Sequence, residues 1–117
     1  MPQILIVDDC PDSIIFLKEF LVTNGYACRF ASSGVMAMEL ISLETFELII
    51  SDYQMENGDG IWLLNELKKI NNSPKVIMTT ADLKFSKEHF LNLGAAAFCP
   101  KPINWPELIS AIETLLG

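Results

Sequence analysis

The sequence is short of basic residues, cysteine and histidine, and it contains no long apolar run. Its 8 lysines and arginines stand against 15 acidic residues, which gives a formal net charge of −7. Such a charge repels nucleic-acid phosphates and anionic lipid. No apolar run approaches the roughly 18 residues of a membrane span, and no charged start leads into an apolar signal segment. We therefore expect a cytoplasmic protein that binds another protein or a cation, with no direct nucleic-acid or membrane contact.

The three cysteines are scattered, with no C-x-x-C pair and no histidine at metal-ligand spacing. This pattern indicates neither a disulfide framework nor a zinc site. We expect Cys28 and Cys99 to be small buried groups, whereas Cys10 follows an acidic pair and is a candidate reactive thiol. The only histidine, His89, lies inside an expected helix. Since a G-x-S-x-G elbow and a Gly-rich phosphate loop are also lacking, histidine-driven acid–base chemistry is not expected.

What the sequence does contain is an alternation of short apolar runs with longer amphipathic segments. The expected strands are 3–7, 26–31, 46–51, 74–79 and 95–99, and the expected helices are 11–24, 33–44, 59–71, 83–93 and 104–116. Parallel strands need helical crossovers, so this alternation predicts a parallel sheet covered on both faces. No composition shift divides the chain. We expect one α/β domain over residues 1–117, built as a doubly wound five-stranded parallel (βα)5 sheet.

Several residues predict where individual elements end or what they expose. Gly25 and Gly94 stand where helix C-caps are expected, and Asn104 with Glu107 has capping-box spacing. Pro100 cannot donate to a ladder, which favours an edge strand or a strand already finished. Trp62 belongs to a run of four apolar residues that cannot all face the sheet. One member of that run is therefore expected to be exposed.

Polar residues follow four of the five expected strands. Asp8 and Asp9 end the first strand and Asp52 ends the third, while Thr80 and Lys101 follow the fourth and fifth. In a doubly wound sheet these positions lie along one edge, where ligands bind. Three carboxylates in one crevice repel one another unless a cation joins them, and an all-oxygen ligand set suits Mg²⁺. The sequence therefore predicts a magnesium site at this edge.

The remaining groups at this edge suit phosphoryl chemistry. A hydroxyl and an ammonium beside a metal, here Thr80 and Lys101, are groups that hold phosphoryl oxygens. Asp52 can attack an activated phosphorus and form an acyl phosphate once a cation neutralises both partners. We therefore predict that Asp52 is the phosphorylated residue.

Together these residues resemble the receiver domains of two-component response regulators, over essentially the whole chain. The matching motifs, in order, are Asp8-Asp9, Asp52 with Met55 and Gly60, Thr80-Ala81, and Lys101-Pro102. The resemblance implies a flavodoxin-like strand order of 2-1-3-4-5 and a cis Lys101-Pro102 peptide. It also implies Mg²⁺ held by Asp9, Asp52 and the backbone carbonyl of Gln54, with Asp8 acting through water. Lys101, Thr80 and the N–H of Ala81 would bind the phosphoryl oxygens.

The resemblance further implies a signalling role in a phosphorelay. Asp52 would accept phosphate from a histidine kinase or a histidine phosphotransfer protein. Movement of Thr80 and reorientation of Phe98 would then change the surface formed by the fourth helix, fifth strand and fifth helix. The expected readers are a downstream protein effector or a fused output domain, with phosphorylation-dependent dimerisation a further option. The domain would assist its own phosphorylation and dephosphorylation without being an enzyme for an external metabolite.

Three other interpretations meet different obstacles in the sequence. A haloacid-dehalogenase-like phosphatase needs Asp two residues after its nucleophile, where this chain has Gln54. A flavodoxin-like electron carrier would have its phosphate repelled by Asp8 and Asp9. A receiver-like interaction scaffold that is not regulated by phosphorylation stays open, although the intact set of site residues argues against it. Glu56 and Gly58 depart from the family pattern, so we expect a looser or differently shaped loop after Asp52.

Overall fold

A computed structural model describes residues 2–82 and 84–117 and contains one sheet of five parallel strands. The strands are β1 (Gln3–Val7), β2 (Ala27–Ala31), β3 (Leu48–Asp52), β4 (Lys75–Thr80) and β5 (Ala97–Pro100). The helices are α1 (Pro11–Thr23), α2 (Gly34–Leu43), α3 (Gly60–Leu67), α4 (Lys87–Asn92) and α5 (Trp105–Leu116). The sheet order is β2-β1-β3-β4-β5, so the predicted fold and strand order are confirmed.

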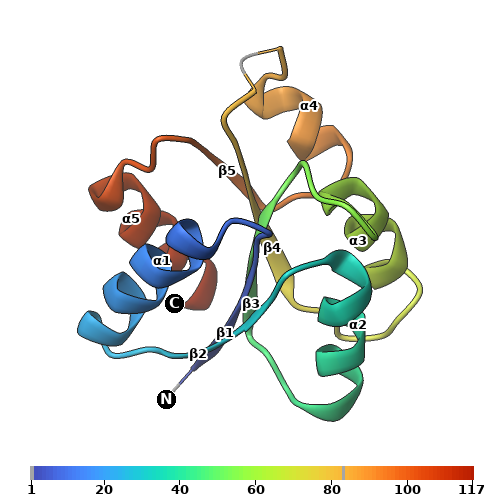
Figure 1. Cartoon of the computed structure of the whole chain (residues 1–117), viewed down its shortest axis with the longest axis horizontal. Helices are drawn as coiled ribbons and strands as arrows, with labels where there is room; N and C mark the ends of the chain where they lie inside the picture. The colour runs from blue at the N-terminus through green and yellow to red at the C-terminus, as the bar shows by residue number, and fades with distance from the viewer. Residues whose placement is uncertain (1, 83) are drawn as a thin grey trace.

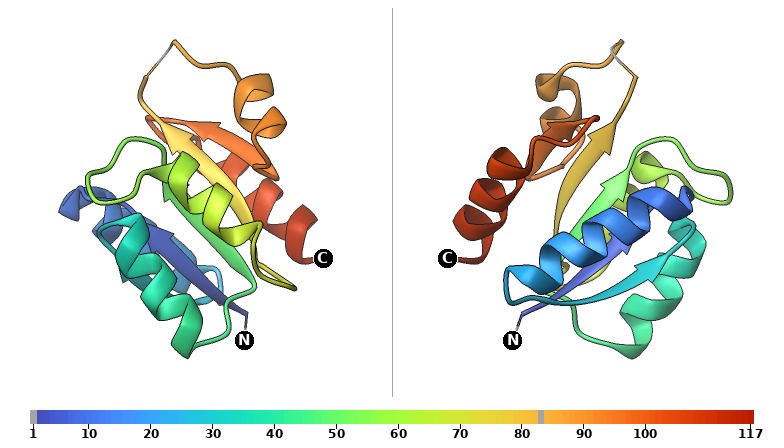
Figure 2. Two further views of the ribbon diagram at one scale, coloured as in Figure 1. Left: turned by 90° about the vertical axis from the view of Figure 1, so that its right-hand side faces the viewer. Right: turned by 60° about the vertical axis from the view of Figure 1, so that its left-hand side comes forward.

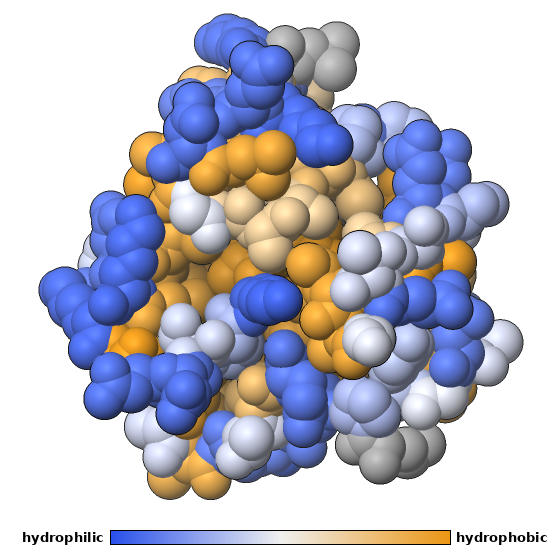
Figure 3. Space-filling view, turned by 180° about the vertical axis from the view of Figure 1, so that it is seen from behind, coloured by the Kyte–Doolittle hydropathy of each residue, from blue (hydrophilic) through white to orange (hydrophobic). Residues whose placement is uncertain are grey.

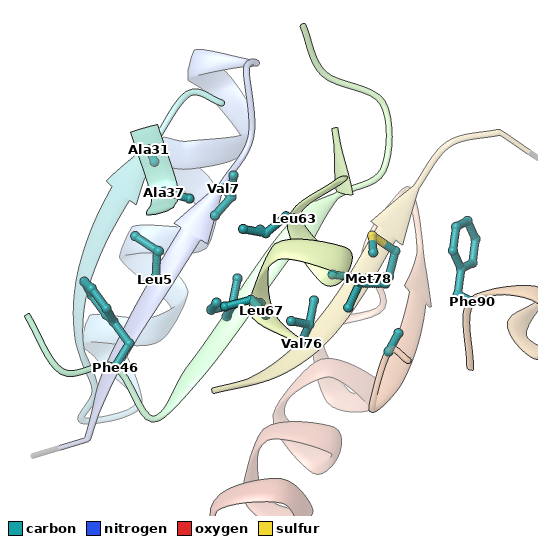
Figure 4. Packing of buried hydrophobic residues seen from close by; sticks show 13 residues of the cluster. Leu5, Val7, Ala31, Ala37, Phe46, Leu63, Leu67, Val76, Met78 and Phe90 are labelled. Carbon is teal, nitrogen blue, oxygen red and sulfur yellow. The ribbon is translucent and has the colours of Figure 1, made fainter. Parts of the chain in front are cut away.

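Helices cover both faces of the sheet, with α1 and α5 on one side and α2 and α3 on the other (Figure 1). Successive strand side chains point to opposite faces. Ile4 and Ile6 of β1 accordingly pack with α1 and α5, and Leu5 and Val7 pack with α2 and α3. All four are fully buried, as a strand covered on both faces requires. Figure 4 shows the buried residues on the α2 and α3 side of the sheet, a cluster that extends to Phe90 of α4.

The N-termini of four helices, α2 to α5, are fixed by side chains that accept their free N–H groups. Ser33 accepts from Met36 at the start of α2, and Asp59 accepts from Trp62 at the start of α3. Asn104 accepts from the N–H of Glu107 at 3.1 Å, as the predicted capping pair requires. Gly25 and Gly94 follow the C-caps of α1 and α4 with φ of +88° and +112°, which confirms both predicted C-cap glycines.

Two helices are five residues shorter than the sequence predicted, whereas the other three differ by only one or two residues. The helix expected over 83–93 begins only at Lys87, because Asp82 binds the N–H of Lys84 in a turn and Ser86 caps the helix. Leu83, its expected first residue, lies outside the described residues. The helix expected over 59–71 ends at Leu67, and the chain turns at Asn72, whose φ is +55°.

The exposed surface mixes polar and apolar side chains. Seen from behind, apolar residues gather toward the middle of the molecule and hydrophilic ones surround them (Figure 3). Trp62 is the exposed member of its apolar run at 37%, whereas Leu63 beside it is fully buried. Pro100 is the last residue of the edge strand β5 and pairs only with β4, in agreement with its predicted place. Within the described part of the chain, no helix combines the length and apolar character needed to cross a membrane.

Candidate functional site

The site lies at the carboxyl ends of β1, β3, β4 and β5. Asp52 is the last residue of β3, and Thr80 is the last residue of β4. Each strand is thus one residue longer at its carboxyl end than the sequence predicted. Asp8 directly follows β1, and Lys101 directly follows β5. Because the strands are parallel and in register, these residues reach the same edge of the sheet. The predicted convergence of Asp8, Asp52 and Lys101 is observed in their contacts.

Three carboxylates form the acidic part of the site. Asp8, Asp9 and Asp52 each offer a carboxylate oxygen within 4.8 Å of the others. Asp8 is almost completely buried, Asp9 is exposed, and the side chain of Asp52 is 12% exposed. Oxygen atoms at this spacing, with one exposed carboxylate, fit Mg²⁺, which takes one or two protein carboxylates and keeps several waters. The donor set therefore fits the cation that the sequence predicted.

Lys101 reaches into this acidic cluster from the β5–α5 connection. Its Nζ lies 2.8 Å from Asp8 Oδ2 and 3.6 Å from Asp52 Oδ2. Burial alone would lower the pKa of Lys101, but the hydrogen bond to Asp8 and the negative charge of Asp52 outweigh that effect and raise the pKa. The Lys101–Pro102 peptide is cis, as expected. The Lys101 N–H also donates to the Thr80 carbonyl at 2.9 Å, which ties the two strand ends together.

Asp52 has the most strongly perturbed carboxyl group of the site. Burial raises its pKa from 3.8 to about 6; the positive charge of Lys101 opposes this rise, while the negative charges of Asp8 and Asp9 add to it. A proton and a cation therefore compete for this carboxylate. A divalent ion beside Asp52 would favour its charged form, which is the nucleophilic one.

Thr80 is buried, and its hydroxyl already has a partner. Its Oγ1 accepts the N–H of Asp82 at 3.0 Å. Asp82 in turn accepts the N–H of Lys84 at 2.9 Å and the side-chain amide of Gln54 at 3.2 Å. Gln54 therefore links the loop after β3 to the loop after β4 across the mouth of the site. The family resemblance implied a role for the backbone carbonyl of Gln54, but no sequence pattern indicated this side-chain contact. Ala81, whose N–H was predicted to bind phosphate, is exposed directly after β4.

The loop after Asp52 is firmly connected at both ends, although the sequence led us to expect a looser or differently shaped one. Its first carbonyl, that of Tyr53, accepts the N–H of Gly60 at 3.0 Å. Farther along, Asn57 and Gly58 adopt positive φ values of 57° and 95°. Their carbonyls accept N–H groups from the start of α2. The unusual glycine thus permits a left-handed turn that brings the loop to α2.

Phe98 of β5 lies in a row of aromatic rings. It stacks on Phe90 with ring centroids 5.1 Å apart, and Phe90 meets Tyr53 edge-on, also at 5.1 Å. Phe90 is fully buried and Phe98 is half-buried. Since Tyr53 follows Asp52 directly, the row connects the acidic site with the edge strand. The sequence indicated the position of Phe98 but gave no signal for its ring partners.

The remaining chemically active side chains are those of His89 and the three cysteines. His89 is in α4 and stacks on Phe85. Cys99 is buried as expected and Cys28 is partly buried, and burial raises the pKa of both thiols. Cys10 is exposed at the start of α1, and its backbone N–H donates to Asp8 at 2.9 Å.

Comparison with known proteins identifies the family to which this fold and site belong. The family model described as the response regulator receiver domain matches residues 4–113. This chain is a member of the response regulator receiver domain family. It is therefore a signalling domain of two-component systems, and the phosphatase and electron-carrier interpretations are not supported.

Curated relatives of the receiver domain include longer regulatory proteins. The transcriptional regulatory protein CpxR of Klebsiella pneumoniae subsp. pneumoniae is 32% identical over 116 residues, which cover 99% of this chain and 50% of that protein. The transcriptional regulatory protein ZraR of Escherichia coli is also 32% identical over 116 residues, covering 98% of this chain and 26% of that protein. The chain thus spans about half or less of the length of these relatives.

Solved structures give the same assignment. The receiver domain of the Francisella response regulator 1452 superimposes with a TM-score of 0.91 at 31% identity, covering 99% of this chain and 97% of that one. The response regulator TrrA of Thermotoga maritima, solved in complex with Mg²⁺-BeF, gives a TM-score of 0.89 at 29% identity. That alignment covers 99% of this chain and 100% of TrrA.

Proposed function

We propose that this receiver domain is a phosphoacceptor switch in which Asp52 takes a phosphoryl group from a phosphohistidine in the presence of Mg²⁺. The observation that carries the proposal is the environment of Asp52. One of its carboxylate oxygens lies within 4.8 Å of oxygens of Asp8 and Asp9, and its Oδ2 lies 3.6 Å from the Lys101 ammonium. Cation ligands and a phosphoryl-binding ammonium thus surround one half-buried carboxylate.

In this proposal Asp9, Asp52 and the backbone carbonyl of Gln54 would hold Mg²⁺, and Asp8 would act through a bound water. The bound ion would neutralise charge that accumulates on the phosphoryl oxygens during transfer. One Asp52 carboxylate oxygen attacks the phosphorus, so that a P–O bond forms as the P–N bond to histidine breaks. The leaving imidazole keeps the electron pair of that bond and takes up a proton from solvent. The domain thereby assists its own phosphorylation and later hydrolysis without turning over a metabolite.

Lys101 and Thr80 would change partners as the phosphoryl group arrives. Lys101 now donates to Asp8, and it would donate instead to a phosphoryl oxygen. The Thr80 hydroxyl now accepts the N–H of Asp82, and it would donate to a second oxygen together with the N–H of Ala81. The Thr80 shift would exchange a neutral contact for a charge-assisted one, which is the stronger kind. Lys101 would exchange one charge-assisted contact for another. This exchange supports a two-state switch.

The switch would reach the α4–β5–α5 surface by two connections. Release of Asp82 from Thr80 would loosen the turn that precedes α4, because Asp82 also binds the N–H of Lys84. Movement of Phe98 would have to rearrange its stacking with Phe90 of α4. Both changes alter the same surface, which a partner would read.

For partners, we propose a histidine kinase or a histidine phosphotransfer protein as donor, and a protein effector or a fused output domain as reader. CpxR and ZraR are named transcriptional regulatory proteins, and both extend well beyond the region that matches this chain. Regulation of such an output by the receiver, including phosphorylation-dependent dimerisation, is part of the proposal.

A scaffold that is not regulated by phosphorylation is the alternative, and intact-mass measurement separates the two. We expect acetyl phosphate to add one phosphoryl group to the wild type with Mg²⁺, none without Mg²⁺ and none to Asp52→Asn. Asp59→Asn is a matched control, because asparagine still caps α3 and the site keeps its carboxylates. Lack of an adduct would lead to a beryllofluoride binding test. Failure of both tests would reject the switch in favour of the scaffold.

A further inference from the structure

The first N–H groups of α2 are satisfied by the loop that follows Asp52. Helix starts leave several N–H groups without partners inside the helix. Here Gly34 donates to the Gly58 carbonyl at 2.7 Å and Val35 donates to the Asn57 carbonyl at 3.2 Å. The β3–α3 loop arches toward the start of α2, and this is visible from the side (Figure 2). A displacement of the loop away from α2 would therefore leave two helix N–H groups without their acceptors.

The contact between loop and helix is too close to admit one additional methyl group. A Cβ placed on Gly34 would lie 2.6 Å from the Gly58 carbonyl oxygen and 2.9 Å from Cε3 of Trp62. A Cβ placed on Gly58 would lie 2.8 Å from the same Trp62 atom. The Trp62 ring thus fills the space that two glycines leave open. This packing explains why a large aromatic residue on α3 coexists with glycine at an unusual loop position.

The opposite end of the loop is attached at the phosphoacceptor. Tyr53 directly follows Asp52, its N–H donates to Thr79 at 2.8 Å, and its carbonyl accepts the N–H of Gly60 at 3.0 Å. A Cβ on Gly60 would lie 2.8 Å from the Asp52 carbonyl oxygen, so this end is also tightly packed. Gln54 lies between the two attachments. The position of its carbonyl therefore depends on both the sheet and the start of α2.

We infer that Gly34 and Trp62 are positioning residues that hold the loop after Asp52 in the geometry required for a small divalent cation. The inference rests on the proposed function, because it concerns the cation site that includes the Gln54 carbonyl. Neither residue touches the cation. Mg²⁺ demands near-ideal octahedral geometry with oxygens at about 2.0–2.1 Å, whereas Ca²⁺ accepts flexible coordination at about 2.3–2.6 Å. A displaced loop should therefore weaken binding of Mg²⁺ more than binding of Ca²⁺.

Calorimetric titration of Gly34→Ala with each cation tests this inference directly. We expect Mg²⁺ to bind about 10-fold more weakly than to the wild type, with a smaller loss for Ca²⁺. Val35→Ala is the matched control: its backbone N–H still reaches the loop, its side chain is exposed, and we expect both affinities to stay within about 2-fold. Unchanged Mg²⁺ affinity in Gly34→Ala, or an equal loss for both cations, would overturn the inference.

Trp62→Leu provides a second variant should Gly34→Ala fail to fold, because it removes the ring and adds no clash. Hydrogen exchange of the Gly34 and Val35 amides gives a readout independent of activity. We expect Mg²⁺ to slow their exchange in the wild type, because binding and loop attachment stabilise each other, and to slow it less in Trp62→Leu. Equal slowing in both proteins would contradict the positioning role. A wild type that binds no Mg²⁺ and accepts no phosphoryl group would instead reject the proposed function.

Discussion

At the scale of single residues, the Lys101 ammonium lies closer to one carboxylate of the site than to the other. Lys101 is 2.8 Å from Asp8 but 3.6 Å from Asp52. Asp8 is only 1% exposed, and a buried carboxylate without a partner is costly. Lys101 therefore compensates the charge that lacks water, while Asp52 is left with a longer contact and a partly exposed side chain. The longer distance from Lys101 keeps Asp52, the proposed nucleophile, available to a cation and to a phosphoryl donor.

The raised pKa of Asp52 predicts a pH dependence of stability in the metal-free protein. The folded state holds this proton more firmly than the unfolded state, with a pKa of about 6 against 3.8. The stabilisation is thus fully present below the unfolded pKa and is lost as pH rises through the folded one. From these values we expect Asp52 to add about 1.4 kcal/mol to the free energy of unfolding at about pH 5 and almost nothing at about pH 7.5.

Urea denaturation without divalent ions, at both pH values, measures this effect. Asp52→Asn removes the titrating group at similar size, so the difference between wild type and variant isolates its contribution from other titrations. That difference should favour the wild type more at the lower pH. A difference that does not change with pH would show that the fold leaves the affinity of Asp52 for protons unaltered.

The sequence predicted the identity of the site residues better than it predicted their contacts. Asp8, Asp52 and Lys101 could be found because each one follows an apolar run, and a parallel sheet brings such positions together. The pairing of Lys101 with Asp8 and the bond between Gln54 and Asp82 could not be found. They join residues 93 and 28 positions apart, and they depend on side-chain rotamers that no local pattern encodes.

At the scale of elements, α4 shows how capping sets a boundary that periodicity does not. Apolar spacing predicted a helix from residue 83, but the helix begins at Lys87. Asp82 forms a local turn with the N–H of Lys84, and Ser86 accepts the N–H of His89 at 3.2 Å. Short polar side chains compete with helix hydrogen bonds in this way. The result is a six-residue helix that relies strongly on its cap and on Phe90.

We expect Ser86→Ala to lower the free energy of unfolding by about 1 kcal/mol, because the N–H of His89 loses its acceptor. Ser42→Ala is the matched control. The Ser42 hydroxyl lies near the end of α2 and donates to the Glu39 carbonyl, so no helix N–H depends on it. Urea denaturation should leave that variant within about 0.5 kcal/mol of the wild type. Equal losses in the two variants would show that the Ser86 cap has no special role in α4.

At the scale of the whole molecule, the alternation of strands and helices was enough to predict a parallel sheet but not its strand order. Parallel crossovers and two-sided burial follow from the residue pattern of any such chain. The order β2-β1-β3-β4-β5 was implied only by the resemblance to receiver domains. The order determines which strand ends are neighbours, and here it makes β1 and β3 adjacent. The acidic cluster therefore depends on topology as much as on the carboxylates themselves.

The molecule as a whole combines a net charge of −7 with three carboxylates at one edge of its sheet. Both features predict that cations stabilise the fold, but in different ways. Any salt screens general repulsion, whereas a coordinated ion binds only the folded cluster. At a Mg²⁺ concentration about tenfold above its dissociation constant, binding should add about 1.4 kcal/mol, or an increase in Tm of about 6 °C for a domain of this size.

Thermal unfolding with MgCl₂, and with NaCl at equal ionic strength, separates these two contributions. We expect the larger increase in Tm with MgCl₂ for the wild type and nearly equal, small increases with both salts for Asp9→Asn. Asp9 is the suitable position because it is exposed, so its replacement removes a proposed ligand without leaving a cavity in the core. Equal increases with both salts in the wild type would mean that general screening accounts for the stabilisation. An undiminished Mg²⁺ effect in Asp9→Asn would instead remove Asp9 from the proposed ligand set.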